Sequence, residues 1–484
     1  MSSDFAIALT LAIPLGGAIL IALCHRAPNV REAVTLAAAV ALFASALALL
    51  PRVLAGERPS LALLEPFPGI AVRFDVEPFG LLFALVASAL WIVSTVYSIG
   101  YMRSNNEGHQ TRFYVCFALA LGSTIGVAFA GNLLTLLFFY EALTFATYPL
   151  VTHHGDDEAR RGGRTYLGVL LLTSTVFLFP AVVWTWLAAG TLDFVPGGIL
   201  AGKLSRTDAT ILLALFMLGI GKAALMPFHR WLPAAMVAPT PVSALLHAVA
   251  VVKAGVFAVL KVAVFTFGLG ASGASFDWLL YLAAFTILAA SLVALRSDNL
   301  KRRLAYSTVS QLSYIVLSVA VLAPLSVVAA ALHIVTHAFG KITLFFAAGA
   351  IYTASGKTEV SQLDGIGRRM PWTMAAFAVG ALSLIGIPPA AGFLSKWLMF
   401  QGAAGAGHWT VLAVLATSTL LNAAYFLPVV YAAFFRRAPQ EDATHGEAPW
   451  TMVSALTLTA AITIVLPFFS AVPLRLARML AGAT

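Results

Sequence analysis

Fourteen long apolar runs follow one another along the chain, and they restrict its fold more than any other feature. A bilayer core roughly 30 Å thick requires about 20 apolar residues per helical span, which matches these runs. The runs lie at roughly 5–23, 33–51, 79–100, 113–130, 132–151, 165–190, 209–226, 242–267, 278–295, 304–323, 326–351, 372–400, 410–435 and 449–468. Only 10% of the residues are charged, against about a quarter in soluble domains. We therefore expect an all-α polytopic membrane protein with about 14 transmembrane helices in a lipid bilayer.

The basic residues of the predicted loops gather on one side of the membrane. One set of alternate loops carries 17 of them, namely Arg26, Arg31, Arg103, Arg112, Arg160, Arg161, Arg164, Arg230, Arg296, Lys301, Arg302, Arg303, Lys357, Arg368, Arg369, Arg436 and Arg437. The other set carries 7, namely Arg52, Arg58, Arg73, Lys203, Arg206, Arg475 and Arg478. The positive-inside rule places the richer side in the cytoplasm and both termini outside, in a bacterial inner (plasma) membrane. Because the net charge of +9 is spread over many short loops, we expect no nucleic acid as a partner.

The five remaining lysines lie inside predicted spans, whereas every arginine lies in a predicted loop. These lysines are Lys222, Lys253, Lys261, Lys341 and Lys396. A buried lysine amine can lose its proton, but an arginine stays charged. Each such charge costs about 2.5–3.5 kcal/mol at mid-span, so five of them indicate groups kept for proton transfer. Lys261 lies nearest a span end, and its ammonium group can alternatively extend toward the membrane surface.

Glu141 is the one acidic residue, of twenty, that lies well inside a predicted span. It is the natural counter-ion for one of the buried lysines. Such a pair would hold the lysine protonated, and weakening the pair would release the proton. The alternative is a static ion pair that only joins two helices.

Histidines add further protonatable groups to the same spans. His333, His337 and Lys341 are spaced four residues apart, so they share one helix face over about 12 Å. His247 shares another span with Lys253. The pattern favours a proton path. A zinc site is the rival interpretation, but no nearby cysteine or carboxylate completes one, so we predict no metal.

Two spans contain prolines that a continuous helix does not accommodate. Pro227, Pro233, Pro239 and Pro241 follow Lys222, and Pro388 and Pro389 precede Lys396. Backbone groups that lose their helix hydrogen bonds inside the membrane need partners from protein or water. Each break therefore predicts a hydrated cavity beside a lysine. The breaks fall on spans 7 and 12, which are five spans apart. Because five is an odd number, equivalent spans cross the membrane in opposite directions.

This spacing predicts two inverted five-helix repeats. We expect spans 1–3 in residues 1–112 and the first repeat, spans 4–8, in 113–267. The second repeat, spans 9–13, would occupy 278–435, and span 14 with a short tail would occupy 449–484.

Three stretches resemble the antiporter-like subunit family that complex I, membrane-bound hydrogenases and Mrp-type cation/proton antiporters share. They are residues 238–248 (APTPVSALLHA), 301–311 (KRRLAYSTVSQ) and 386–397 (GIPPAAGFLSKW). The resemblance extends from about 75 to 435. Within the family, residues 363–372 (LDGIGRRMPW) look most like the D-type component of the Mrp antiporters.

The resemblance implies a proton path from cytoplasmic uptake, across a central axis of lysine and histidine, to an outer exit. By resemblance, Glu141, Lys222, Lys253 and Lys396 match the family's functional glutamate and lysines, and the Glu141–Lys222 pair acts as the switch. His333 and His337 match its polar span 11.

The expected function is that of a proton-translocating subunit of a Mrp-type Na⁺(cation)/H⁺ antiporter, working with other membrane subunits. The alternative is a proton-pumping membrane-arm subunit of a redox complex of the NADH dehydrogenase or membrane-bound hydrogenase type. The two cysteines provide no cluster-binding set, so we predict no cofactor and no catalytic redox centre in this chain. A third interpretation, a passive scaffold in inorganic-carbon uptake, fits poorly with so many buried protonatable residues.

Overall fold

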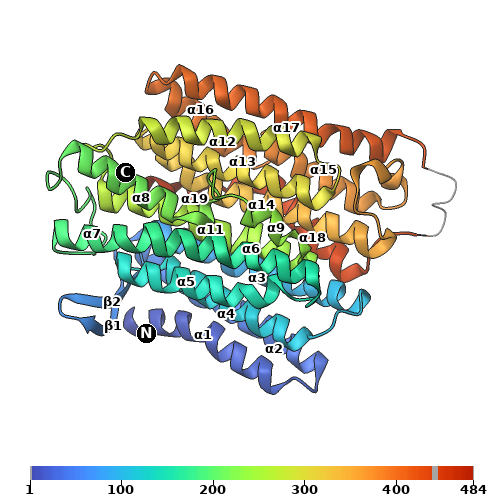
Figure 1. The fold of residues 1–484 in the computed structure, drawn as a ribbon. Coiled ribbons are helices and arrows are strands. Elements are labelled where there is room, and N and C mark those ends of the chain that lie inside the picture. Colours follow the sequence, from blue (N-terminus) through green and yellow to red (C-terminus); the bar gives the residue numbers. More distant parts are fainter. Residues whose placement is uncertain (1–2, 439–444, 483–484) are drawn as a thin grey trace.

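The computed structural model describes residues 3–438 and 445–482, and these residues form a bundle of roughly parallel helices (Figure 1). Eleven helices among them are long and apolar enough to cross a membrane. Eight are single helices: α1 (Ser3–Leu23), α2 (Pro28–Leu54), α3 (Pro78–Ser104), α4 (Gln110–Ala128), α5 (Leu133–Val151), α12 (Asp277–Arg296), α14 (Pro324–Ser355) and α17 (Trp409–Phe435). Three are composite: α6 (Asp157–Thr173) with η1 (Ser174–Leu178) and α7 (Phe179–Ala189); α10 (Thr240–Ala244) with η4 (Leu245–Val249), α11 (Val251–Lys261) and η5 (Val262–Phe267); and α18 (Trp450–Val465) with η9 (Leu466–Phe469). The chain is therefore a multi-pass membrane protein.

Three further predicted spans do not meet this length and hydropathy criterion, so the count of fourteen stays a prediction. α8 (Arg206–Gly219) stops after 14 residues, and α13 (Leu300–Ala320) has three basic residues in its first turn. α15 (Pro371–Ile385) and α16 (Gly392–Gly405) are the two halves of one interrupted segment. The breaks after α8 and α15 lie where the sequence predicts broken spans 7 and 12. The repeat boundaries stay a prediction.

The remaining short elements lie between the long helices. They are η2 (Gly221–Ala223), α9 (Trp231–Ala234), η3 (Ala235–Val237), η6 (Val360–Gln362), η7 (Ile366–Arg368) and α19 (Ala471–Leu480).

Local sequence explains where many helices begin. The side chains of Asn132, Asp156, Ser205 and Asn299 each accept a hydrogen bond from a backbone N–H in the first turn of the following helix. Such a side chain satisfies one of the donors that a helix start leaves open. Proline occupies an early position of α2, α3, α14 and α15, where its missing N–H carries no penalty.

A two-stranded antiparallel hairpin is an element that the sequence analysis missed. β1 (Ser60–Phe67) pairs with β2 (Ile70–Asp75), and Ser60 lies opposite Asp75. The backbone N–H of Asp75 donates to Phe129 O at 2.7 Å, so the hairpin is fastened to the turn between α4 and α5. The hairpin lies at the end of the bundle where α1 starts and α19 finishes (Figure 1).

Two spans form the centre of the bundle. The Thr240–Phe267 segment and α14 are completely buried over their most apolar 18 residues, whereas the corresponding part of α1 is 44% buried. The Thr240–Phe267 segment carries His247, Lys253 and Lys261, and α14 carries His333, His337 and Lys341. The protonatable groups predicted from the sequence therefore lie in the core.

Candidate functional site

Each break in the helix bundle places a lysine among backbone oxygens. α8 ends at Gly219, and Lys222 lies in the short η2 that follows. α15 ends at Ile385, and Lys396 lies near the start of α16. The last carbonyl groups of a helix have no donor within the helix, and at the second break Leu384 O and Ile385 O accept from Lys396 Nζ at 2.8 and 3.1 Å.

Lys222 binds to one face of α5. Its Nζ donates to Tyr140 O at 2.7 Å and to Thr144 Oγ1 at 2.6 Å, and it lies 3.3 Å from the centre of the Tyr140 ring. A direct ion pair with Glu141 was expected and is not formed. In the described part of the chain, both carboxylate oxygens of Glu141 are buried without a hydrogen-bond partner. The reason is geometric, because around the helix Glu141 is displaced by about 100° from Tyr140 and by about 60° from Thr144.

A glycine allows the central helix to approach the first break. A β-carbon at Gly255 would lie 2.3 Å from the carbonyl carbon of Lys222. No residue with a β-carbon fits such an approach without movement of the backbone. Gly255 therefore sets the distance between α11 and η2.

The two central helices meet at Lys253 and His337. Lys253 Nζ lies 2.5 Å from His337 Nδ1, and both side chains are fully buried. Since an ammonium group can only donate, the imidazole nitrogen is the acceptor when the lysine is charged. This hydrogen bond joins the first predicted repeat to the second.

From His337 a line of polar groups leads to Lys396. The rings of His337 and His333 lie 5.7 Å apart, and His333 Nε2 lies 3.0 Å from Gln311 Oε1. Gln311 Nε2 donates to Leu384 O at 3.4 Å. The same oxygen accepts from Lys396 Nζ at 2.8 Å. The line therefore ends at the second break.

A second line of polar groups, the Lys341 branch, leads from Lys341 to the same Leu384 oxygen. Its Nζ donates to Ser307 Oγ at 2.9 Å, and the hydroxyl oxygen of Tyr425 lies 3.0 Å from the same Ser307 oxygen. The Tyr425 hydroxyl donates to Asn422 Oδ1, and Asn422 Nδ2 donates to Leu384 O at 3.4 Å. We name the two lines together the central axis.

The structure thus connects Lys253, His337, His333 and Lys396, with Lys341 on the branch. His247 lies outside both lines. The centre of its ring lies 4.7 Å from that of Phe345 with the planes tilted by 40°, and both ring nitrogens are buried without a hydrogen-bond partner among the described residues.

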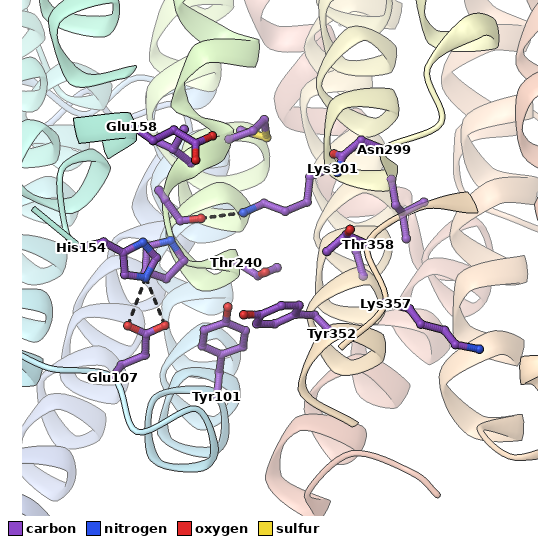
Figure 2. A pocket seen from close by; sticks show the side chains of 16 residues that line it. Tyr101, Glu107, His154, Glu158, Thr240, Asn299, Lys301, Tyr352, Lys357 and Thr358 are labelled. Atoms are coloured by element: carbon purple, nitrogen blue, oxygen red, sulfur yellow. Dashed lines mark hydrogen bonds and ion pairs between the residues drawn. The ribbon is translucent and has the colours of Figure 1, made fainter. Parts of the chain in front are cut away.

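A polar pocket of about 350 Å³ lies at the loop end of α3, between the two predicted repeats. Glu107 faces His154 across its edge, with 3.3 Å between the carboxylate and Nε2 (Figure 2). Lys301 extends into the pocket and donates to Ala238 O at 2.6 Å. Thr240 also lines the pocket, so the buried Thr240–Phe267 segment starts here.

The two histidines beside this pocket have different electrostatic surroundings. The hydrogen bond to Glu107 raises the pKa of His154 above its usual value. Burial lowers the pKa of His153 to about 4, although Glu107 lies 3.6 Å away. At neutral pH His153 is therefore uncharged, because burial outweighs the effect of Glu107 on its pKa.

Lys261 does not extend toward the surface, which was one of the two expectations. It is buried and pairs with Glu77, with 2.5 Å between Nζ and Oε1. It also donates to Ala130 O at 3.1 Å. Extension is unnecessary because the start of α3 brings a carboxylate to the lysine.

Some arginines are also more buried than the loop assignment implied. Arg31 in α2 and Arg303 in α13 are both under 9% exposed. Arg303 donates to Ser297 O and Tyr425 O, both at 2.9 Å, so its charge is held by carbonyl groups.

Several functional candidates were missed from the sequence. Gln311 and Asn422 are single amides within apolar spans, and that property alone could have singled them out. Glu77 gives no such signal, because it precedes Pro78 at a helix start and looks like a loop residue. Ser395 lies 2.8 Å from His333 Nδ1 and adjoins Lys396 in sequence.

Comparisons with known proteins identify relatives of this chain. Residues 130–422 match the model of a family described as NADH:quinone oxidoreductase/Mrp antiporter, TM. NADH-quinone oxidoreductase subunit N of Desulforudis audaxviator is 34% identical over 417 residues, which cover 84% of this chain and 82% of that protein.

Two further similarities concern antiporters. A component of a probable K⁺/H⁺ antiporter of Rhizobium meliloti is 32% identical over 388 residues, covering 78% of this chain but only 38% of that longer protein. A chain of the Mrp complex from Dietzia sp. DQ12-45-1b has the same fold, with a TM-score of 0.87 at 22% identity, covering 99% of this chain and 97% of that one.

Proposed function

Because the chain belongs to the NADH:quinone oxidoreductase/Mrp antiporter transmembrane family, we propose that it moves protons as an antiporter-like subunit of a multi-subunit membrane complex. The complex proposed first is a Mrp-type cation/proton antiporter of a bacterial inner membrane. The observation that carries this proposal is the central axis, in which buried lysines and histidines lead to the second helix break.

The lysines and histidines of the central axis can each pass a proton on. A lysine and a histidine can each hold or release one, and the 2.5 Å hydrogen bond between Lys253 and His337 is short enough for direct transfer. Gln311 cannot change its charge, so it orients His333 and leaves the transfer toward Lys396 to water at the break. Glu141 adjoins Tyr140, one of the two partners of Lys222 Nζ, and its unpaired carboxylate can take up a proton or pair with the lysine after a side-chain movement.

The polar pocket at Glu107 and His154 is the proposed site of proton uptake. It lies among loops rich in basic residues, which the positive-inside rule places in the cytoplasm. Both chain ends would then face outside. The closer relation to the D-type component of the Mrp antiporters remains part of this proposal.

The pump arm of a redox complex is the second candidate. The similarity to subunit N of an NADH-quinone oxidoreductase favours it, since that similarity spans most of both chains. The same central axis would then be driven by electron transfer in partner subunits.

Purification of the tagged chain in mild detergent separates the two candidates. Mass spectrometry should recover small hydrophobic subunits and a larger antiporter-like chain if the complex is an antiporter. Recovery of iron–sulfur or flavin subunits would favour the redox complex.

Reconstitution tests the function itself. Vesicles that contain the purified complex and an internal pH-sensitive dye should show proton movement after a Na⁺ or K⁺ pulse. Absence of cation-driven movement in the intact complex would contradict the antiporter assignment.

A further inference from the structure

A buried ion pair lies at the far end of α3 from the polar pocket, away from the central axis. Lys261 is 1% exposed and Glu77 is 5% exposed, and their charged atoms lie 2.5 Å apart. The proposed path through Lys253, His337 and Lys396 uses neither residue. Two charges removed from water need a reason to be retained, because an apolar pair of similar size is often no less stable.

The pair borders a cavity of about 130 Å³, which has room for about four water molecules. Arg58, Arg73 and Asp75 also line this cavity. Arg73 binds Asp75 at 2.9 Å and reaches Asp193 at 3.4 Å, so these three charges pair with one another. Glu77 and Lys261 therefore have a polar space beside them into which a proton can leave.

One helix connects this cavity with the polar pocket on the other side. Thr240 lines the pocket and Lys261 lines the cavity, and the segment between them is completely buried. His247 and Lys253 lie along the same segment. The eight residues from Lys253 to Lys261 correspond to about 12 Å of helix.

Phenylalanine rings separate the two lysines. Phe257 lies between them in sequence, and its ring stacks 4.5 Å from that of Phe79 and lies 5.1 Å from that of Phe83. Lys261 Nζ is 5.8 Å from the centre of the Phe257 ring. A proton crosses such an apolar layer only when water enters it, so the layer can isolate Lys261 from the central axis.

We propose that Lys261 and Glu77 form a proton-release site on the outer side of the first predicted repeat. The site rests on the proposed function and adds an exit that does not pass through Lys396. The Lys261 ammonium gives its proton to the Glu77 carboxylate, which leaves an amine and a carboxylic acid. The acid releases the proton to water in the cavity, and the amine takes the next proton from water that has passed Phe257. One proton enters and one leaves in each cycle.

A purely structural ion pair would fasten the start of α3 to α11 without exchanging protons. Lys261→Arg distinguishes the two roles. Arginine keeps the positive charge and the pairing with Glu77, but it does not release a proton. The double variant Glu77→Gln/Lys261→Met removes both charges together, so no unpaired charge is left in the core.

The test uses the intact complex in vesicles, with proton movement driven by a cation pulse. We expect Lys261→Arg and the double variant to assemble and to lose at least about tenfold in rate. Lys203→Met is the matched control, because Lys203 is an exposed lysine bound to Ala189 O on the same side, and its rate should stay unchanged. Wild-type rates in both Lys261 variants would overturn the proposal.

Infrared difference spectra after a pH jump give a second measurement that does not depend on transport. We expect a carboxylic acid band in the wild-type complex that Glu77→Gln removes. If the wild-type complex moves no protons but shows this band, the proposed function fails while the exchange at Glu77 stands. Absence of the band would contradict the release site even where cation exchange is normal.

Discussion

Lysine at buried positions is the chemical choice on which the proposed path depends. Lys222, Lys341 and Lys396 each donate to a backbone carbonyl, and Lys253 donates to an imidazole nitrogen. All four contacts are ones that a neutral amine can also keep in part, since an amine retains two N–H groups. The surroundings therefore tolerate both protonation states, as a relay requires.

Substitution of Lys253 by arginine tests this property at the centre. Lys253→Arg keeps a positive charge next to His337 but holds its proton permanently, so we expect proton movement to fall by at least about tenfold. Cation-driven proton movement in vesicles measures the rate. Arg206→Lys, at an exposed loop-side position, is the control and should match the wild type. An active Lys253→Arg complex would show that Lys253 acts only through its charge.

The pair of Glu107 and His154 predicts a pH dependence of stability. Glu107 raises the pKa of His154, and Asp156 acts in the same direction while Lys301 opposes it. The stabilisation of the folded protein by this pair is therefore complete below the ordinary histidine pKa, and it is lost as the pH rises through the raised pKa of His154.

We expect Glu107→Gln to lower the Tm of the complex more at pH 6 than at pH 9. Thermal unfolding at both values measures the difference. Glu57→Gln, which removes an exposed carboxylate, should show no such dependence. An equal loss of Tm for Glu107→Gln at both pH values would contradict the assignment.

Individual residues also show where sequence reasoning succeeds. The five span lysines were identifiable because each breaks an apolar run, whatever its neighbours are. Their partners depend on packing between distant segments: Glu77 and Lys261 are 184 residues apart, and Lys253 and His337 are 84 apart. No local pattern carries this information, so the Glu77 pair was missed and the Glu141 pair was wrongly expected to be direct.

Among the elements, the helix breaks were predictable and the hairpin was not. Proline runs interrupt a helix through their own backbone chemistry, which is visible in the sequence. The hairpin β1–β2 gains its place from hydrogen bonds to the turn between α4 and α5, far along the chain. Similarly, the first turn of α13 contains three basic residues, and composition alone does not show that Lys301 and Arg303 bind carbonyl groups.

The close approach of α11 to η2 makes Gly255 a sensitive position. We expect Gly255→Ala to destabilise the protein by about 1–3 kcal/mol, because its β-carbon would overlap the backbone of Lys222. A fall in Tm of the purified complex measures the effect. At Gly168 in α6 a β-carbon meets no atom within 4 Å, so Gly168→Ala should be neutral or slightly stabilising. Equal effects of the two substitutions would mean that α11 can shift away from the break.

At the scale of the whole molecule, two breaks and two central helices form a single unit. α14 contacts both the first and the second predicted repeat, and the hydrogen bond between Lys253 and His337 crosses between them. The membrane class followed from composition and run length. The way in which the two repeats meet did not follow from the sequence, because it depends on which faces of two fully buried helices pack together.

Because the proposed path runs in series, a lysine lost from either half should stop it. We expect Lys222→Ala and Lys396→Ala each to reduce proton movement by at least about tenfold, with little further loss in the double variant. Glu141→Ala should resemble Lys222→Ala if the two act as a switch. Initial rates in vesicles measure this, with subunit composition checked by mass spectrometry. Losses that multiply in the double variant would indicate two independent paths.

The carbonyl oxygen of Leu384 receives Lys396, Gln311 and Asn422, but a carbonyl has only two lone pairs. The three donors therefore compete for it. The ammonium lies nearest, at 2.8 Å, and the two amides are left at 3.4 Å. When Lys396 withdraws or becomes neutral, Gln311 and Asn422 can both close on the oxygen. A change in the position or charge of Lys396 would then alter the hydrogen bonds of the histidine line and of the Lys341 branch at the same time, through one shared atom.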